Sequence, residues 1–166
     1  MRTATVLSAL LAAGLSVGAL KAEAQTSANI QATATVLSAV TVAAGQNLAF
    51  ANVTPGVAKT IAITDAGAGR FDVTKAANQG VTLSFTLPTN LTFSGNNLPI
   101  ASWTGGWNPT ATPAGATSFT PSAGGTNTTV TAGTTVFVYV GATVSPAAAQ
   151  AAGNYTGNVT MSAVYF

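Results

Sequence analysis

Residue types that most often carry chemistry are missing from this chain, or nearly so. There is no cysteine and no histidine, and the single glutamate, Glu23, lies close to the amino terminus. Histidine, cysteine and paired carboxylates supply most zinc sites, nucleophile–base pairs and glycosidase acid–base pairs. We therefore expect no enzymatic activity, no cofactor and no small-molecule substrate. The lack of cysteine also excludes disulfides, so packing or assembly must stabilise the chain.

Charged residues are scarce as well. Beyond residue 24 only five remain, all between residues 59 and 75: Lys59, Asp65, Arg70, Asp72 and Lys75. Soluble monomeric domains usually carry about a quarter of their surface as charged residues. A surface so poor in charge suits a protein whose copies cover one another in an assembly. It offers no basic patch, so we expect no nucleic-acid partner.

The amino terminus has the pattern of a secretory signal peptide. Arg2 is followed by an uncharged stretch, residues 3–20, and then by Lys21-Ala22-Glu23-Ala24. This order of a basic residue, an apolar segment and small residues is typical of a cleaved signal. We predict that residues 1–24 are removed after Ala24, and that the protein is secreted and located at the cell surface. With no cysteine near the cut, lipid attachment is not expected.

Residues 26–42 alternate small or apolar side chains with polar ones. Such alternation predicts a strand, but this one is about three times the usual length of roughly 5 to 6 residues. We interpret its first part as an N-terminal extension, residues 25–37, and its second part, Ser38–Ala43, as the first strand of a domain at 38–166. The apolar face of the extension consists of Ala28, Ile30, Ala32, Ala34 and Val36.

The same alternation recurs along the rest of the chain. It predicts strands at 58–64, 70–74, 81–87, 91–93, 136–144 and 155–165. We expect the first two to form a hairpin, and 136–144, apolar on both faces, to be central. Turn residues recur about every ten positions, which favours an all-β sandwich or barrel. Residues 145–153 predict a helix of one or two turns, and residues 105–128 a long mobile loop.

The charged cluster has two interpretations. Asp65 and Asp72 are candidate calcium ligands, although calcium usually takes about 6 to 8 oxygens and more carboxylates than two. Alternatively, the cluster is a charged hairpin that discourages edge-to-edge pairing, which we favour. Lys59 and Lys75 are candidate bases, but we interpret both as solvated charges at strand ends.

Both tryptophans lie in the stretch "SWTGGWNP". Trp103 and Trp107 are candidate glycan contacts, since paired exposed aromatic rings stack on sugars. Large aromatic residues are mostly buried, however, so at least one of them is expected to cap the core.

The last predicted strand has one apolar face, and we expect no turn or partner strand after it. A sandwich with this last strand has an unpaired edge and a groove that exposes its core. The free N-terminal extension has the length and pattern to fill such a groove by strand addition. We expect the acceptor side of the groove to include Tyr155, Val159, Met161, Ala163 and Tyr165.

Two segments resemble a known family. The stretch "ATATVLSAVTVAAGQNLAFANVTPG" near the start and "VYVGATVSPAAAQAAGNYTGNVTMSAVYF" at the end resemble a bacterial family of secreted domains called domain of unknown function 4402. The ending is also similar to that of chaperone-usher pilus subunits. That likeness implies an incomplete immunoglobulin-like fold completed by a neighbour's extension. It also implies a periplasmic chaperone and an outer-membrane usher as partners.

The sequence therefore predicts an all-β, immunoglobulin-like subunit of an extracellular filament or surface assembly. Copies of the chain would polymerise head to tail by donor-strand insertion. Two alternatives remain open at this point. One is a secreted glycan-binding or adhesive module, and the other is a monomer whose extension fills its own groove.

Overall fold

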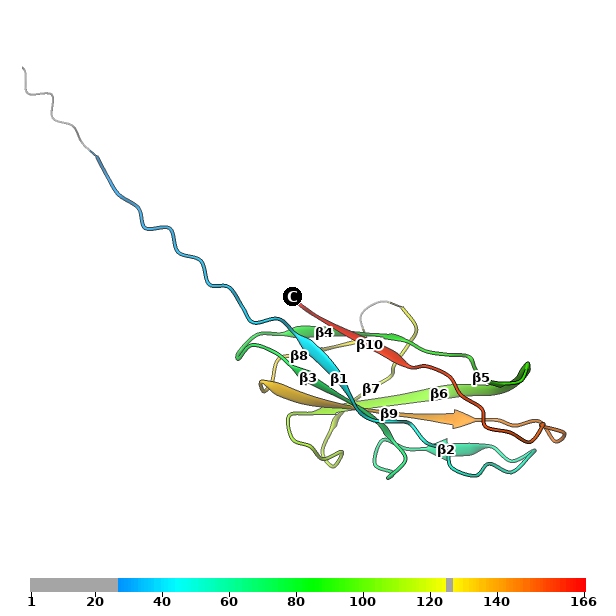
Figure 1. Ribbon diagram of the computed structural model, residues 1–166. Helices are drawn as coiled ribbons and strands as arrows, with labels where there is room; N and C mark the ends of the chain where they lie inside the picture. Colours follow the sequence, from blue (N-terminus) through cyan, green and yellow to red (C-terminus); the bar gives the residue numbers. More distant parts are fainter. Residues whose placement is uncertain (1–26, 125–126) are drawn as a thin grey trace, which may run out of the picture. The chain divides into compact units, whose positions relative to one another are not determined.

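The computed structural model describes residues 27–124 and 127–166, and its strands form antiparallel sheets (Figure 1). The strands are β1 (Thr41–Gln46), β2 (Lys59–Ile61), β3 (Gly69–Thr74), β4 (Val81–Thr86), β5 (Asn90–Phe93), β6 (Asn96–Asn108), β7 (Thr117–Phe119), β8 (Thr128–Val130), β9 (Thr135–Val144) and β10 (Thr160–Tyr165). All of them lie in one unit, residues 36–166. The described residues contain no helix, so the all-β prediction is confirmed. The predicted signal peptide lies outside the described residues.

The larger sheet is built around β9. One edge of β9 pairs with β6, and the other edge pairs with β3 along residues 135–140 and with β2 along residues 142–144. Strand β9 has neighbours on both edges, so the central position predicted for 136–144 is confirmed. The predicted hairpin between 58–64 and 70–74 is wrong, since β2 and β3 follow one another along β9 and do not pair together.

The smaller sheet has the order β10-β4-β8 and packs its apolar face against the larger one. Val81, Leu83 and Phe85 of β4 point inward and are at most 3% exposed. They meet Val138 and Val140 of β9 in one buried cluster. The period of two in the sequence therefore produces a two-layered arrangement consistent with a β-sandwich.

Two irregular segments differ from the predictions. The helix predicted for residues 145–153 is wrong: the Gln150 N–H donates to the Ala147 carbonyl and its side chain accepts from the Ala147 N–H, which closes a single turn. The predicted loop 105–128 contains the end of β6 and all of β7. Gly105 suggested a loop, but a Cβ there would lie 2.6 Å from the Phe119 ring. This glycine makes room for an aromatic side chain on the neighbouring strand.

The first strand and one lysine also differ from the predictions. Strand β1 begins at Thr41 and continues to Gln46, three residues beyond the predicted end, and all six residues are exposed. Lys75 is not a solvated charge: it is 3% exposed, and its Nζ donates to the carbonyls of Gln79 and Thr131. Lys59 is partly exposed and donates to the carbonyl of Asn52.

Tyr165 anchors the end of β10. Its hydroxyl accepts a hydrogen bond from the Ala76 N–H at 2.6 Å and donates one to the Ser38 carbonyl at 3.0 Å. This single group therefore joins β10 to the turn after β3 and to the residues that lead into β1.

Replacing Tyr165 with phenylalanine is expected to lower the free energy of unfolding by about 1–2 kcal/mol, because two hydrogen bonds are lost while the ring remains. Urea unfolding followed by circular dichroism measures the change. Ser162→Ala, on the exposed face of the same strand, is the matched control and should leave the midpoint unchanged. Equal midpoints for Tyr165→Phe and the parent would show that the hydroxyl contributes nothing to stability.

Candidate functional site

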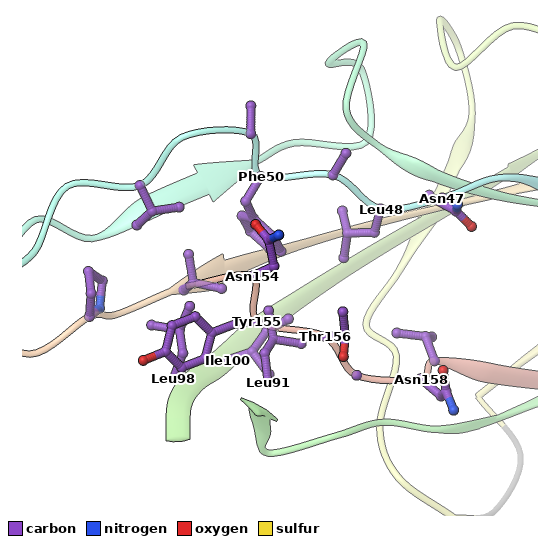
Figure 2. A pocket seen from close by; sticks show the side chains of 18 of the residues that line it. Asn47, Leu48, Phe50, Leu91, Leu98, Ile100, Asn154, Tyr155, Thr156 and Asn158 are labelled. Atoms are coloured by element: carbon purple, nitrogen blue, oxygen red, sulfur yellow. The ribbon is translucent and has the colours of Figure 1, made fainter. Parts of the chain in front are cut away.

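A groove opens between two irregular segments of residues 36–166 (Figure 2). Residues 47–53, which follow β1, form one wall, and residues 154–159, which lead into β10, form the other. The groove has a volume of about 880 Å³. Its floor is apolar and comes from four side chains of β5, β6 and β9: Leu91, Leu98, Ile100 and Val144.

The first wall, 47–53, directs its apolar residues toward the floor. Leu48 and Phe50 alternate with exposed Asn47 and Ala49, and Phe50 is 8% exposed. Phe50 and Leu48 both pack on the cluster that holds Ile100 and Val144. The wall therefore has the side-chain pattern of a strand, although it belongs to no strand.

The second wall, 154–159, also alternates. Tyr155 and Val159 are half-buried, whereas Asn154, Thr156 and Asn158 are exposed. The Tyr155 ring packs 5.7 Å from the Phe93 ring of β5, and its hydroxyl donates to the Ala151 carbonyl. Tyr155 thus fixes the second wall against the floor.

The backbone of both walls is largely unpaired within the described residues. On the first wall, the Ala49 N–H donates to Gly67, and the Asn52 carbonyl accepts from Lys59. On the second wall, Thr156 exchanges two hydrogen bonds with Thr92 of β5. Tyr155 and Gly157 have no backbone bond in the described chain, and in an extended segment their N–H and C=O groups point away from β5. Those groups face the groove.

The described residues at the rim of the groove are mostly uncharged amides. They are Gln46, Asn47, Asn52, Gln150, Asn154 and Asn158. Among the described residues that line the groove, Arg70 alone is charged. Its guanidinium is paired with Asp72 at 2.8 Å. The groove therefore favours a neutral occupant with an apolar face and free backbone groups.

One end of the groove is closed. Beyond Val159 the second wall becomes β10, which contacts β1, and Tyr165 bonds to Ser38 at the far end of that seam. At the other end, around Val53, Pro55, Pro146 and Gly153, the lining residues belong to turns and bends or to no regular element. Next to Pro55 and Pro146, the Gly56 N–H donates to the Ala147 carbonyl at 3.1 Å.

The predicted acceptor residues divide into two groups. Tyr155 and Val159 line the groove, as the sequence suggested. Met161 is buried in the core between the sheets, and Ala163 and Tyr165 pack against the same core. The alternation of the last strand could not separate these groups, because it continues unbroken from the groove into the sandwich.

The residues of the predicted extension are exposed. Residues 27–37 belong to no strand, and the exposed fractions of Ile30 and Val36 are 95% and 94%. The sequence also missed the first wall and the floor. Alternation of Leu48 and Phe50 was a usable signal, whereas Pro99 hid the strand that supplies Leu98 and Ile100.

Neither candidate glycan contact lines the groove, although Trp103 also packs against the cluster that supplies its floor. Trp103 and Trp107 are half-buried on β6, and both pack against the core between the sheets. A β-bulge interrupts the pairing of β6 with β9 between Ala101 and Thr104, next to Trp103. Much of each ring is occupied by core contacts, so a glycan role for these residues stays a prediction.

The acidic residues are held in separate interactions. The Asp65 carboxylate accepts from the Ala62 N–H, while Asp72 pairs with Arg70. The described residues show no group of three metal-ligating side chains. Burial raises the pKa of the Tyr139 hydroxyl above its usual value, and Tyr139 does not line the groove.

Comparison with known proteins finds no matching family model, no matching curated protein and no matching solved structure. In the described part of the chain, no helix has the length and apolar character needed to cross a membrane. The functional interpretation therefore depends on the groove itself.

Proposed function

We propose that this protein is a structural subunit of an extracellular filament, and that its groove accepts a β-strand from a neighbouring copy. The observation that carries the proposal is an apolar groove whose two walls present unpaired backbone groups within the described residues. Tyr155 is half-buried and Gly157 is exposed, so their free backbone groups can bond to water, and an added strand would pair them instead. The domain is then an immunoglobulin-like sandwich that lacks one strand.

The N-terminal extension matches the groove in chemistry. Its apolar residues, including Ile30 and Val36, alternate with Asn29, Gln31, Thr33 and Thr35, and it carries no charge between residues 25 and 40. The groove has an apolar floor and an amide rim. One face of the inserted extension would meet the floor while the other faced water, so an uncharged alternating strand is the fitting occupant.

This interaction produces a filament. Because the extension and the groove are different surfaces, each copy would bind one neighbour as donor and another as acceptor, and such heterologous contacts form open fibres unless a rotation closes them. Burial between copies also explains why a chain with so few charges need not aggregate at random. Export by a signal peptide and the resemblance of the ending to chaperone-usher subunits support a location at the cell surface. They also support a chaperone and an usher as assembly partners.

The purified chain beginning at Gln25 is expected to form filaments in negative-stain electron micrographs and particles of high, concentration-dependent mass by light scattering. The same chain without residues 25–37 should remain monomeric and folded, because the removed residues precede every described strand. A parent chain that stays monomeric at all concentrations, or a shortened chain that still forms filaments, would contradict the proposal.

A further inference from the structure

We propose that neighbouring filaments join side by side through the outer face of the smaller sheet, where a copy in one filament packs this face against the same face of a copy in the next. The inference rests on the proposed function for the filaments themselves and adds a second contact between copies. The surface is separate from the groove, because the described lining residues of the groove include none from β4, β8 or β10.

The outer face of the smaller sheet consists of side chains that alternate with those of the core. Strands β4, β8 and β10 lie together on one side of the larger sheet, so one of their faces is turned away from it (Figure 1). The side chains on this outer face are short or β-branched, and none is charged: Thr82, Ser84, Thr86, Thr129, Thr160, Ser162 and Val164. Strand pairing arranges them in rows, with Thr82 between Thr129 and Val164.

One end of this face is apolar. The exposed fractions of Val164 and Phe166 are 58% and 69%. The Phe166 N–H donates to the Gly80 carbonyl, and the Phe166 ring occupies the space that a side chain at Gly80 would need. Because Gly80 lies two residues before Thr82, the ring rests on the outer face. An aromatic ring and a valine exposed on the same side of one strand form a patch of the kind that marks a contact surface.

The distribution of charge indicates which partner fits. The five charged residues beyond residue 24 lie on β2, on β3, between them or directly after β3: Lys59, Asp65, Arg70, Asp72 and Lys75. Strands β4, β8 and β10 carry none. Their outer face therefore offers nothing to a charged partner, and it does not repel its own copy.

The chemistry of the face makes it complementary to itself. A hydroxyl group both donates and accepts hydrogen bonds, so the threonine and serine side chains can pair with the same residues of a second copy. A two-fold axis near Val164 would also bring the apolar residues of the two copies together, since the same patch serves both partners in such a contact. A second copy is thus the occupant that matches both parts of the face.

The size of the face explains why it would act in filaments and not between single copies. Its strands lie about 4.8 Å apart and rise about 3.4 Å per residue, so three strands of up to six residues cover roughly 300 Å². Stable interfaces bury about 800 Å² per partner. Isolated copies should therefore stay apart, whereas a filament presents the face many times, and linked contacts can strengthen binding by about 10²–10⁴.

Lysine substitutions on the face test the inference. Filaments of the parent chain beginning at Gln25 should form bundles in micrographs and sediment at low speed. Thr82→Lys and Val164→Lys should give single filaments, with at least tenfold less protein in the low-speed pellet at about 0.01 M ionic strength, where charges act over roughly 30 Å. Thr74→Lys is the matched control, because it adds the same charge at an exposed position on β3, and its filaments should form bundles as the parent's do.

Salt separates a neutral contact from a charged one. At about 1 M salt, charges act over only roughly 3 Å, and the parent's bundles should persist. Their loss in salt would overturn the inference, because it would show that charged residues hold the bundles together. Bundling of both Thr82→Lys and Val164→Lys at the parent's level, or loss of bundles in Thr74→Lys alone, would overturn the choice of face. Parent filaments that stay single contradict only this inference, whereas the absence of filaments contradicts the proposed function as well.

Discussion

Removal of residues 161–166 is expected to abolish folding of the chain, and not only its assembly. These residues form most of β10, which pairs with β4 from Thr160 to Tyr165. Met161 is buried, and Ala163 and Tyr165 pack against the same core. Each buried apolar side chain contributes about 1.5–3 kcal/mol, and exposing β4 adds to the loss. The sum is comparable to the roughly 5–15 kcal/mol that stabilise a whole domain.

Circular dichroism and urea unfolding of the shortened chain measure this effect. We expect no cooperative transition and mostly insoluble protein. Val164→Thr is a suitable control, because Val164 is exposed on the outer face of β10 and its replacement should leave the protein folded. Soluble shortened protein with a cooperative transition would show that β10 is dispensable for the core.

Ile30→Asp is expected to prevent assembly, while Gln31→Asp should permit it. Ile30 belongs to the apolar face of the extension, so the variant would place an unpaired carboxylate in an apolar groove. That costs several kcal/mol even after relaxation. A cost of about 4 kcal/mol lowers the association constant roughly a thousandfold. Gln31 belongs to the opposite face, where a carboxylate stays in water.

Filament yield in micrographs and mass by light scattering compare the two variants at equal concentration. Both variants add the same charge, so a general effect of charge would affect them equally. Both should also unfold at the parent's urea midpoint, because Ile30 and Gln31 are exposed and outside every strand. Normal filaments from Ile30→Asp, or their loss in Gln31→Asp alone, would contradict the assignment of the two faces.

The sequence predicted those parts of the fold in which burial follows a regular period. Strand β4 is buried on one face, so Val81, Leu83 and Phe85 alternate with polar residues and reveal it. Strand β9 has neighbours on both edges and is nearly continuous in apolar residues. In each case the pattern reports the environment of the strand directly.

Where tertiary packing overrides local signals, the sequence was misleading. Gly105 suggested the start of a loop, yet it lies inside β6. Gly105 is there because the Phe119 ring covers it, a contact that exists only after β7 has paired. Lys75 is buried because two carbonyls from separate turns surround its Nζ, and no local pattern reports such a contact.

The candidate site was partly predictable for the same reason. Tyr155 and Val159 belong to an alternating segment, so the sequence located one wall of the groove. The other wall contains Leu48 and Phe50, but the predicted first strand ended at Ala43 and no element was predicted for residues 47–53. Its separation from the sheet results from the three-dimensional path of residues 47–53, which a one-dimensional pattern does not contain.

The most direct test asks whether the groove binds the extension. The full-length Ile30→Asp chain, expected to be monomeric, serves as the acceptor, and a synthetic peptide of residues 26–37 with the parent sequence serves as the donor. At a hundredfold excess over the dissociation constant, binding to the folded state contributes about 2.7 kcal/mol, which raises the melting temperature of a domain of this size by roughly 10 °C. A peptide carrying Ile30→Asp should give no shift. We predict a saturable rise with the parent peptide alone, and an unchanged melting temperature at every peptide concentration would contradict strand insertion into the groove.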